Sequence, residues 1–295
     1  MSIILQRTKS DRVVDAVIYA GMAVFALLTL FPLYYVFVVS ITPFSEVLRH
    51  GGFLVVPRTF SWDAYQTIFG SPVVPRAIRV TVIITVLGTA ANLAITLLTA
   101  YPLSKKSLRG RNAVLLGIVF TILFSGGLIP TYLTVRSLGL LNSLWALILP
   151  GLISTFNMLI VKTYFENLPA EVEEAAKVDG CSDWQTLIRV VLPLSKPVIA
   201  TVGLFYAIQH WNSYYGALLY ITDKKLYPIQ VVLRNMIRTD SVSNELSTQF
   251  AQIQTLPPET VKMATVCVAV LPLLLVYPFL QRFFIQGVTL GAVKG

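Results

Sequence analysis

The chain has 295 residues, of which 55% are hydrophobic and only 13% are charged, and its mean hydropathy is +0.72. A soluble globule of this size cannot bury so many apolar side chains, so the composition indicates a protein whose solvent is the lipid bilayer. The net charge of +9 does not indicate nucleic-acid binding, because the lysines and arginines cluster beside apolar runs, where they orient a membrane protein. We therefore expect membrane lipid, and no nucleic acid, as a partner.

Six apolar segments are long enough to cross a bilayer, because roughly 20 helical residues span its hydrocarbon core. Inside lipid only helices or a closed barrel satisfy the backbone polar groups, and the chain lacks the alternating pattern of barrel strands. The prediction is an all-α integral membrane protein in which residues 1–12 form an N-terminal tail and residues 13–295 form one transmembrane domain. The predicted spans, several of them kinked by proline, are residues 13–41, 78–102, 113–133, 143–163, 198–220 and 263–284.

The density of basic residues in short loops predicts the orientation, because lysine and arginine resist translocation. Four basic residues lie in the loop 103–112, and three more precede the first span. Both termini and the polar stretch 168–197 are therefore predicted to be cytoplasmic. The outer segments also carry basic residues, so the asymmetry is one of density rather than of count. The longest outer segment, 221–262, includes a predicted helix over Pro228–Arg238 and fits either a docking surface for an extracytoplasmic partner or a solvated loop.

The polar stretch 168–197, between the fourth and fifth spans, predicts a helix, a glycine turn and a second helix. Pro169 suits the first position of a helix, and the acidic residues that follow favour its N-terminus. This short helix should run to Val178 and end at Asp179 and Gly180.

Ser182 is a suitable cap for the second helix, with Gln185 as its capping-box partner. Pro193 and Pro197 bracket the return to the membrane. Because a span anchors each end, the whole unit can transmit a push from a soluble protein as a rigid lever.

The spacing inside this stretch resembles the EAA loop of the membrane subunits of binding-protein-dependent ABC importers. Glu174-Ala175-Ala176 is followed after three residues by Gly180 and after nine more by Val190, before Leu192-Pro193. Val190 stands where that family more often has isoleucine, and Cys181 where it often has alanine. Four further segments resemble carbohydrate-uptake permeases related to the maltose permeases. They are FSGGLIPTYL (124–133), LNSLWALILPG (141–151), residues 192–234 and GVTLGAVKG (287–295). The resemblance covers most of the chain from about residue 75 onward.

The resemblance implies a non-catalytic permease subunit whose EAA helix docks into a cleft of a cytoplasmic ATPase. Closure of the ATPase pair on ATP would rock the spans between inward-facing and outward-facing states. The residues that it assigns to this coupling are Glu174, Ala175, Ala176, Asp179, Gly180, Leu187 and Pro193. Glu174 would meet a basic residue of the ATPase, Gly180 would supply the turn, and Ala175, Ala176 and Leu187 would form the packed face. The alternative is an amphipathic interfacial helix with no partner.

The chain has no G-x-x-x-x-G-K-[ST] phosphate loop, so we expect no bound cofactor and ATP hydrolysis by another subunit. Six spans make only half of the membrane part of a typical importer. We therefore expect a second permease chain, related or identical, to complete it. The expected assembly adds two cytoplasmic ATPase subunits and an extracytoplasmic sugar-binding protein that docks on the outer loops, in a bacterial cell membrane. Oligosaccharides are the expected cargo by resemblance, and the basic outer residues leave room for acidic sugars.

A polar and aromatic cluster in the fifth span predicts the sugar pathway. Sugars pack their C–H faces on aromatic rings, and their hydroxyls need donors and acceptors that lipid lacks. The candidates are Gln209, His210, Trp211, Asn212 and Tyr214, with Tyr132 and Asn157 as weaker ones that can equally cap or bridge helices. An aromatic belt at the outer interface explains Tyr215 and Tyr220 better. At the depth of His210 and Asn212, the alternative to a pore is an interhelical hydrogen bond.

The alternative function is a secondary transporter or a channel for small polar solutes. Such proteins usually bury a carboxylate or a cation site near the midplane, and the spans of this chain offer none. A membrane enzyme would need a nucleophile with a base, or a metal cluster. The histidine inside the spans has no Asp, Glu or Cys ligand near it in sequence, so neither a catalytic nor a metal site is expected.

Overall fold

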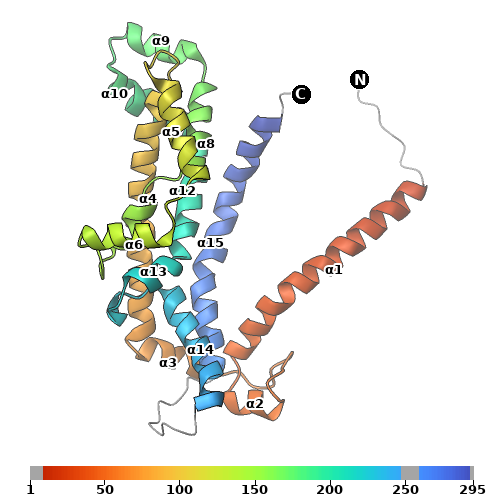
Figure 1. Cartoon of the computed structure of the whole chain (residues 1–295). Helices are drawn as coiled ribbons and strands as arrows, with labels where there is room; N and C mark the ends of the chain where they lie inside the picture. The colour runs from red at the N-terminus through yellow and green to blue at the C-terminus, as the bar shows by residue number, and fades with distance from the viewer. Residues whose placement is uncertain (1–8, 247–258, 293–295) are drawn as a thin grey trace. The chain divides into compact units, whose positions relative to one another are not determined.

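The computed structural model describes residues 9–246 and 259–292, and every regular element in these two ranges is helical. Figure 1 shows the helices coloured in chain order. The chain divides into two compact units. The first comprises Met1–Ser71 and Met236–Val268, and the second comprises Pro72–Asn235 and Ala269–Gly295. The all-helical prediction is confirmed for the described part of the chain.

The first unit begins with the long helix α1, Lys9–Ser40, followed by α2, Phe44–Arg49, and α3, Asp63–Gly70. Only 11% of the most apolar stretch of α1 is buried, so its leucine, valine and phenylalanine side chains require hydrocarbon around them. Between α2 and α3 the carboxylate of Glu46 accepts hydrogen bonds from the backbone N–H groups of Arg58, at 2.8 Å, and Thr59, at 3.2 Å. This carboxylate therefore fixes the connecting loop.

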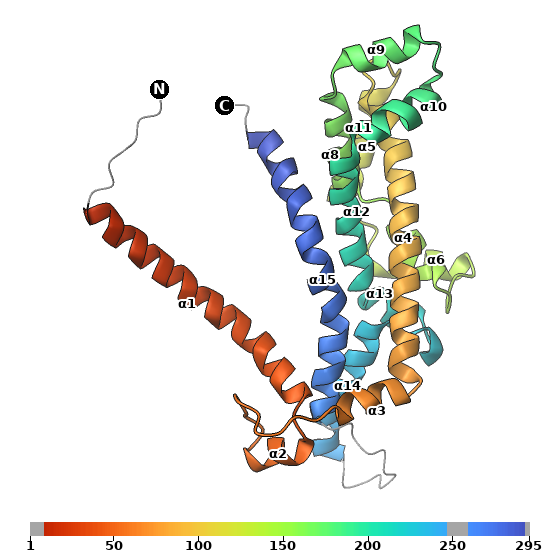
Figure 2. The same cartoon turned by 180° about the vertical axis from the view of Figure 1, so that it is seen from behind.

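The second unit is built on three helices, α4 (Val73–Ser104), α8 (Thr155–Glu166) and α12 (Lys196–Trp211), which pack side by side (Figure 2). The other elements of this unit are α5 (Arg111–Leu123), α6 (Leu128–Ser137), α7 (Trp145–Ile148), η1 (Leu149–Gly151), α9 (Ala170–Val178), α10 (Asp183–Thr186), η2 (Leu187–Val191), α11 (Leu192–Leu194), α13 (Tyr215–Tyr220) and η3 (Lys224–Leu226). Helices α14, Ile229–Leu246, and α15, Glu259–Ala292, continue from one unit into the other.

Three stretches are long and apolar enough to cross a membrane as continuous helices, namely Arg12–Ser40, Val73–Ser104 and Glu259–Val276. Three bent helix pairs raise this number to as many as six, so a multi-pass membrane protein is confirmed and the exact set of spans is not. The predicted helix over Pro228–Arg238 is present as part of α14, which is longer than expected.

The structure differs from the prediction within three spans. Helix α5 ends at Leu123 and α6 turns away from it by 112°, because Gly127 adopts φ +84°, a conformation that side-chain-bearing residues avoid. The segment 143–163 bends by 54° after the 3₁₀ turn that contains Pro150. The segment 198–220 is broken between α12 and α13. Average hydropathy reports the apolar length of a segment but not the short turns that interrupt its helix.

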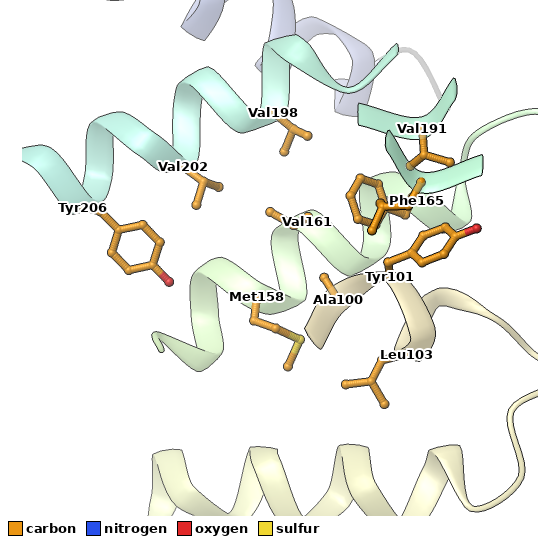
Figure 3. Close-up of a cluster of buried hydrophobic side chains, with 11 residues drawn as sticks. Ala100, Tyr101, Leu103, Met158, Val161, Phe165, Val191, Val198, Val202 and Tyr206 are labelled. Carbon is orange, nitrogen blue, oxygen red and sulfur yellow. The ribbon is translucent and has the colours of Figure 1, made fainter. Parts of the chain in front are cut away.

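A cluster of buried side chains joins α4, α8, α12 and η2 (Figure 3). Met158, Val161, Val191 and Val202 are all fully buried in it, and the rings of Tyr101 and Phe165 meet edge to face with centroids 6.2 Å apart. Lipid tails are as apolar as these side chains, so close packing rather than exclusion of water holds such helices together. The cluster makes α4, α8, α12 and η2 one packed body.

Candidate functional site

The first half of the polar stretch folds as the sequence predicts. Helix α9 ends at Val178 with Asp179 as its C-cap, and Gly180 adopts φ +77°. The N–H of Gly180 donates to the carbonyl of Lys177 at 3.0 Å, and the N–H of Cys181 donates to the carbonyl of Ala176 at 2.9 Å. These two bonds form a Schellman motif, which satisfies the last carbonyls of the helix and requires the left-handed residue. Pro169 is the N-cap, one residue before its predicted place.

The predicted capping box is also confirmed. The side chain of Ser182 accepts a hydrogen bond from the N–H of Gln185 at 3.3 Å, and the side chain of Gln185 accepts one from the N–H of Ser182 at 2.9 Å. The second helix then widens into the π-helical turn η2 and bends by 83° into α12 at Ser195. Pro193 is exposed in α11, just before this bend.

Two predicted coupling residues are buried, and one of them, Leu187, attaches the stretch to the membrane helices. Ala176 and Leu187 are 5% and 3% exposed, and Leu187 belongs to the buried cluster of α4, α8 and α12. Lys105, after the end of α4, forms an ion pair with Glu173 on α9 and lies over the ring of Tyr101 at 4.4 Å. The helix-turn-helix is therefore fastened to the transmembrane body at several points.

The opposite face of the stretch is open. Glu174, Ala175 and Asp179 are exposed, as are the apolar side chains of Val178, at 87%, and Trp184, at 58%. Ala175 therefore lies on the open face beside Glu174, apart from the packed Ala176. An exposed carboxylate surrounded by exposed apolar groups is suited to contact a protein surface that offers both a cation and apolar side chains.

A cavity of about 680 Å³ lies between α9, α10 and the end of α4. Its lining combines apolar with basic side chains and consists of Leu98, Tyr101, Pro102, Lys105, Ser107, Leu108, Arg109, Lys177, Asp183, Trp184 and Leu187. Three cationic side chains and one carboxylate give this recess a net positive charge. The cavity lies next to the open face of α9 and is lined in part by Lys177 of that helix.

His210, a predicted pathway residue, is only 4% exposed and lies between helices. Its Nε2 is 2.8 Å from the Oδ1 of Asn92 on α4, and the amide of Asn92 donates to the carbonyls of Gly151, at 2.6 Å, and Leu152, at 2.9 Å. Because an amide oxygen only accepts, Nε2 must carry the proton. These bonds connect α4 and α12 to the bend before α8, where the two carbonyls lack helical partners.

A second polar connection lies along the same helices. The hydroxyl of Tyr206, fully buried, is 2.7 Å from the Oγ1 of Thr96 and accepts a hydrogen bond from the N–H of Ser154 at 3.1 Å. Asn92, Thr96 and Tyr206 were missed by the reasoning from sequence. Their signal was their polarity in the middle of an apolar span, where such groups almost always have interhelical partners.

The remaining pathway candidates are dispersed. Trp211 is buried and donates from Nε1 to the carbonyl of Ala269 on α15 at 2.9 Å. Gln209 and Asn212 are exposed. Tyr214 is half-buried and lies beneath the guanidinium of Arg234, whose carbon is 4.7 Å from the ring centroid.

The two weaker candidates lie on other elements. The ring of Tyr132 on α6 stacks on that of Tyr220 at 6.2 Å, and Asn157 is 5% exposed in the first turn of α8. Asn212, which is exposed, and Tyr214, which is half-buried, both lie in the break between α12 and α13. Within the described ranges, no group of three or more His, Cys, Asp or Glu residues has the arrangement of a metal site.

Residues 1–290 match the family of binding-protein-dependent transport system inner membrane components. The chain is 45% identical over 285 residues to the polygalacturonan/rhamnogalacturonan transport system permease protein YtcP of Bacillus subtilis, covering 97% of this chain and 99% of that protein. It is 44% identical over 293 residues to protein LplC of the same organism, covering 99% of this chain and 98% of that protein.

Solved structures show the same similarity. A chain of a bacterial ABC transporter involved in the import of the acidic polysaccharide alginate is 32% identical, with a TM-score of 0.85 over 94% of this chain and 98% of that one. A chain of a bacterial alginate ABC transporter in complex with an alginate pentasaccharide-bound periplasmic protein shares the fold at 16% identity, with a TM-score of 0.58 over 93% and 96% of the two chains. The resemblance predicted from the sequence is confirmed.

Proposed function

Because the chain belongs to the family of binding-protein-dependent transport system inner membrane components, we propose that it forms one half of the translocation pathway of an ATP-driven importer of oligosaccharides. Relatives that transport polygalacturonan, rhamnogalacturonan or alginate support a saccharide as cargo. The chain itself performs no catalysis. Its tasks are to bind a cytoplasmic ATPase, to change conformation with it and to provide a polar surface for the sugar.

The orientation follows from the need to meet that ATPase. The stretch 168–197 and the basic loop 103–112 lie at the same end of the second unit, where Lys105 pairs with Glu173. We place this end in the cytoplasm of a bacterial cell, together with both termini. The opposite end, which contains η3 and the start of α14, then faces the outside and a sugar-binding protein.

One observation supports the coupling role: Glu174 is exposed on α9, which packs on η2 and is paired through Glu173 with Lys105 at the end of α4. Ala176 and Leu187 are buried beneath this helix and its successor, and the Schellman motif and the capping box hold the turn between them. A force applied at Glu174 is therefore transmitted to α4, α8 and α12 through packed side chains rather than through a loose loop. This geometry suits a lever between ATPase and pathway.

The rest of the assembly follows from what this chain lacks. It has no phosphate loop, so two partner ATPase subunits hydrolyse ATP. A second permease chain, identical or related, completes the pathway, and an extracytoplasmic binding protein delivers the sugar. Neither a cofactor nor a metal ion is assigned to this subunit.

The experiment is to replace Glu174 by alanine and to compare it with Glu171→Ala, which removes another exposed carboxylate from the same helix. Glu174→Ala is expected to lower sugar uptake and the amount of ATPase that co-purifies by about tenfold or more, because a charged contact in an interface is worth about 2 kcal/mol or more. Glu171→Ala should stay within twofold of wild type. Equal uptake and equal ATPase recovery in the two variants would refute the coupling role of Glu174.

A further inference from the structure

The break between α12 and α13 and the start of α14 bring four side chains together at the proposed outer end. Asn212 is the C-cap of α12, and Tyr214 precedes α13. Gln230 and Arg234 are one helical turn apart on α14, so they share one face of that helix. The helix is fixed against α4, because the N–H of Ile229 donates to the hydroxyl of Thr81 at 2.9 Å.

The four side chains form two contacting pairs. The amide nitrogen of Gln230 donates to the Oδ1 of Asn212 at 3.3 Å, and the guanidinium of Arg234 covers the ring of Tyr214. A guanidinium that lies on an aromatic face keeps N–H donors at its edge. Among the described residues, Arg234 has no carboxylate within ion-pair distance. The cluster is at the surface, since Asn212 is exposed and the other three are half-buried.

The surroundings of this cluster are strongly basic. In residues 72–80, 134–146 and 216–235, whose helices contact one another in the second unit, six side chains are cationic and one is a carboxylate. The cations are Arg76, Arg79, Arg136, Lys224, Lys225 and Arg234. The single carboxylate, Asp223, is already used by the N–H of Lys225 at 2.8 Å. Lysine and arginine are usually sparser outside a membrane than inside it, and an excess of cations at this surface attracts anions.

We infer that Asn212, Tyr214, Gln230 and Arg234 form a binding site for the carboxylate-bearing residues of an acidic oligosaccharide. Arg234 pairs with the uronate carboxylate, the exposed part of the Tyr214 ring takes a C–H face of the sugar, and the two amides bond its hydroxyls. The surrounding cations raise the local concentration of the anionic sugar. The inference rests on the proposed transport function and on the outward orientation of this end, and it names the class of sugar and the residues that select it.

The test compares uptake of trigalacturonate with uptake of its trimethyl ester, which has nearly the same shape without the negative charges. Both are measured in cells that carry the complete transport system and lack other routes for these sugars. Each variant rate is divided by the wild-type rate for the same sugar, which removes the preference of the binding protein. The amount of permease in the membrane is measured for every variant to exclude loss by misfolding.

Arg234→Gln is expected to lower trigalacturonate uptake about tenfold or more, as expected for loss of a charge-assisted contact, and to change ester uptake less than twofold. Arg234→Lys should restore part of the trigalacturonate uptake. Tyr214→Ala should lower uptake of both sugars. The matched control is Arg136→Gln, which removes one of the six positive charges but none of the four proposed binding side chains. It should lower trigalacturonate uptake less than threefold and change ester uptake less than twofold.

Four outcomes would overturn the inference while leaving the proposed function standing. Three concern the variants: equal uptake by Arg234→Gln and wild type, equal losses for the acid and the ester, and the same loss of acid uptake in Arg136→Gln as in Arg234→Gln. The fourth is a wild-type protein that takes up the ester but not trigalacturonate. Uptake of neither sugar, nor of any other oligosaccharide, by the wild type would instead overturn the proposed function.

Discussion

The sharpest structural prediction concerns Gly88, which faces the ring of His210 in the middle of α4. A Cβ added at Gly88 would lie 2.5 Å from Nε2 and 2.7 Å from two ring carbons of His210. An ordinary contact is near 3.5 Å, so the ring must move by about 1 Å. The ring cannot do this and keep its 2.8 Å contact with Asn92. Gly88→Ala should therefore both strain the packing around His210 and break its hydrogen bond to Asn92.

The size of the effect follows from these two losses. Overpacking of a buried site costs about 1–3 kcal/mol, and a buried donor or acceptor left without its partner costs about 1–3 kcal/mol. Alanine favours a helix over glycine by about 1 kcal/mol, which offsets part of the loss. We expect Gly88→Ala to lower the free energy of unfolding by about 1–5 kcal/mol. Gly117→Ala is the matched control, because Gly117 lies in α5 with nothing within 4 Å of the added carbon.

The assay is reversible unfolding of the purified protein in detergent, followed for Gly88→Ala, Gly117→Ala, His210→Ala and the double variant of Gly88 and His210. Removal of the imidazole makes room for the new methyl group, so the double variant should be no less stable than His210→Ala alone. The coupling energy between the two sites should therefore be at least as large as the loss in Gly88→Ala alone, about 1–5 kcal/mol. Equal stability of Gly88→Ala and Gly117→Ala, or simply additive losses in the double variant, would refute the predicted clash between Gly88 and His210.

Three further changes test other contacts. Tyr206→Phe leaves a backbone N–H and a threonine hydroxyl without their shared partner, and should lower the free energy of unfolding by about 1–2 kcal/mol in the same assay. Lys105→Glu should lower ATPase-coupled sugar uptake and Lys105→Glu with Glu173→Lys should recover it, although stability should change by less than about 1 kcal/mol. Hydrogen bonds from the hydroxyl of Thr59 and nearby N–H groups hold the pKa of Glu46 below its usual value, so its stabilising effect is present at neutral pH and is lost as the pH falls through that lowered pKa. Protease cleavage of residues 41–62 should therefore rise in acid, and Thr59→Val should move the onset to higher pH.

Each of these has an outcome that contradicts it. Tyr206→Phe with wild-type stability would mean that the hydroxyl contributes nothing to the joint between α4, α8 and α12. Failure of the swapped pair to regain uptake would show that Lys105 acts through something other than Glu173. An unchanged cleavage onset in Thr59→Val would remove the hydroxyl as the cause of the shift at Glu46.

Sequence reasoning predicted the cytoplasmic helix-turn-helix well because its signals are local. The Schellman turn at Gly180 and the capping box of Ser182 and Gln185 depend on residues within six positions of one another. Each satisfies backbone groups that its own segment leaves open, so the pattern in the sequence determines the geometry. The assignment of these residues to ATPase coupling came from resemblance and stays a prediction.

The pathway was harder to predict because its contacts join residues far apart in the chain. The partner of His210 is Asn92, 118 positions away, and the partner of Tyr214 is Arg234 on a different helix. Hydropathy shows that both regions are apolar and that polar side chains interrupt them, but not which of these meet. The broken spans were missed for a related reason, since a left-handed Gly127 and a bend after Pro150 have little effect on average hydropathy.

The position of Leu187 and Val191 in the buried core has a consequence for exchanging parts between transporters. Residues 179–185 are held by their own turn and cap, whereas Thr186 is fully buried and the next helical turn belongs to the packing of α4, α8 and α12. A graft that replaces only 179–185 would change the exposed Asp179 and Trp184 and keep the host's packing. A graft that extends through 191 would also import foreign core residues. The boundary between an interchangeable part and a part specific to its host therefore lies before Thr186.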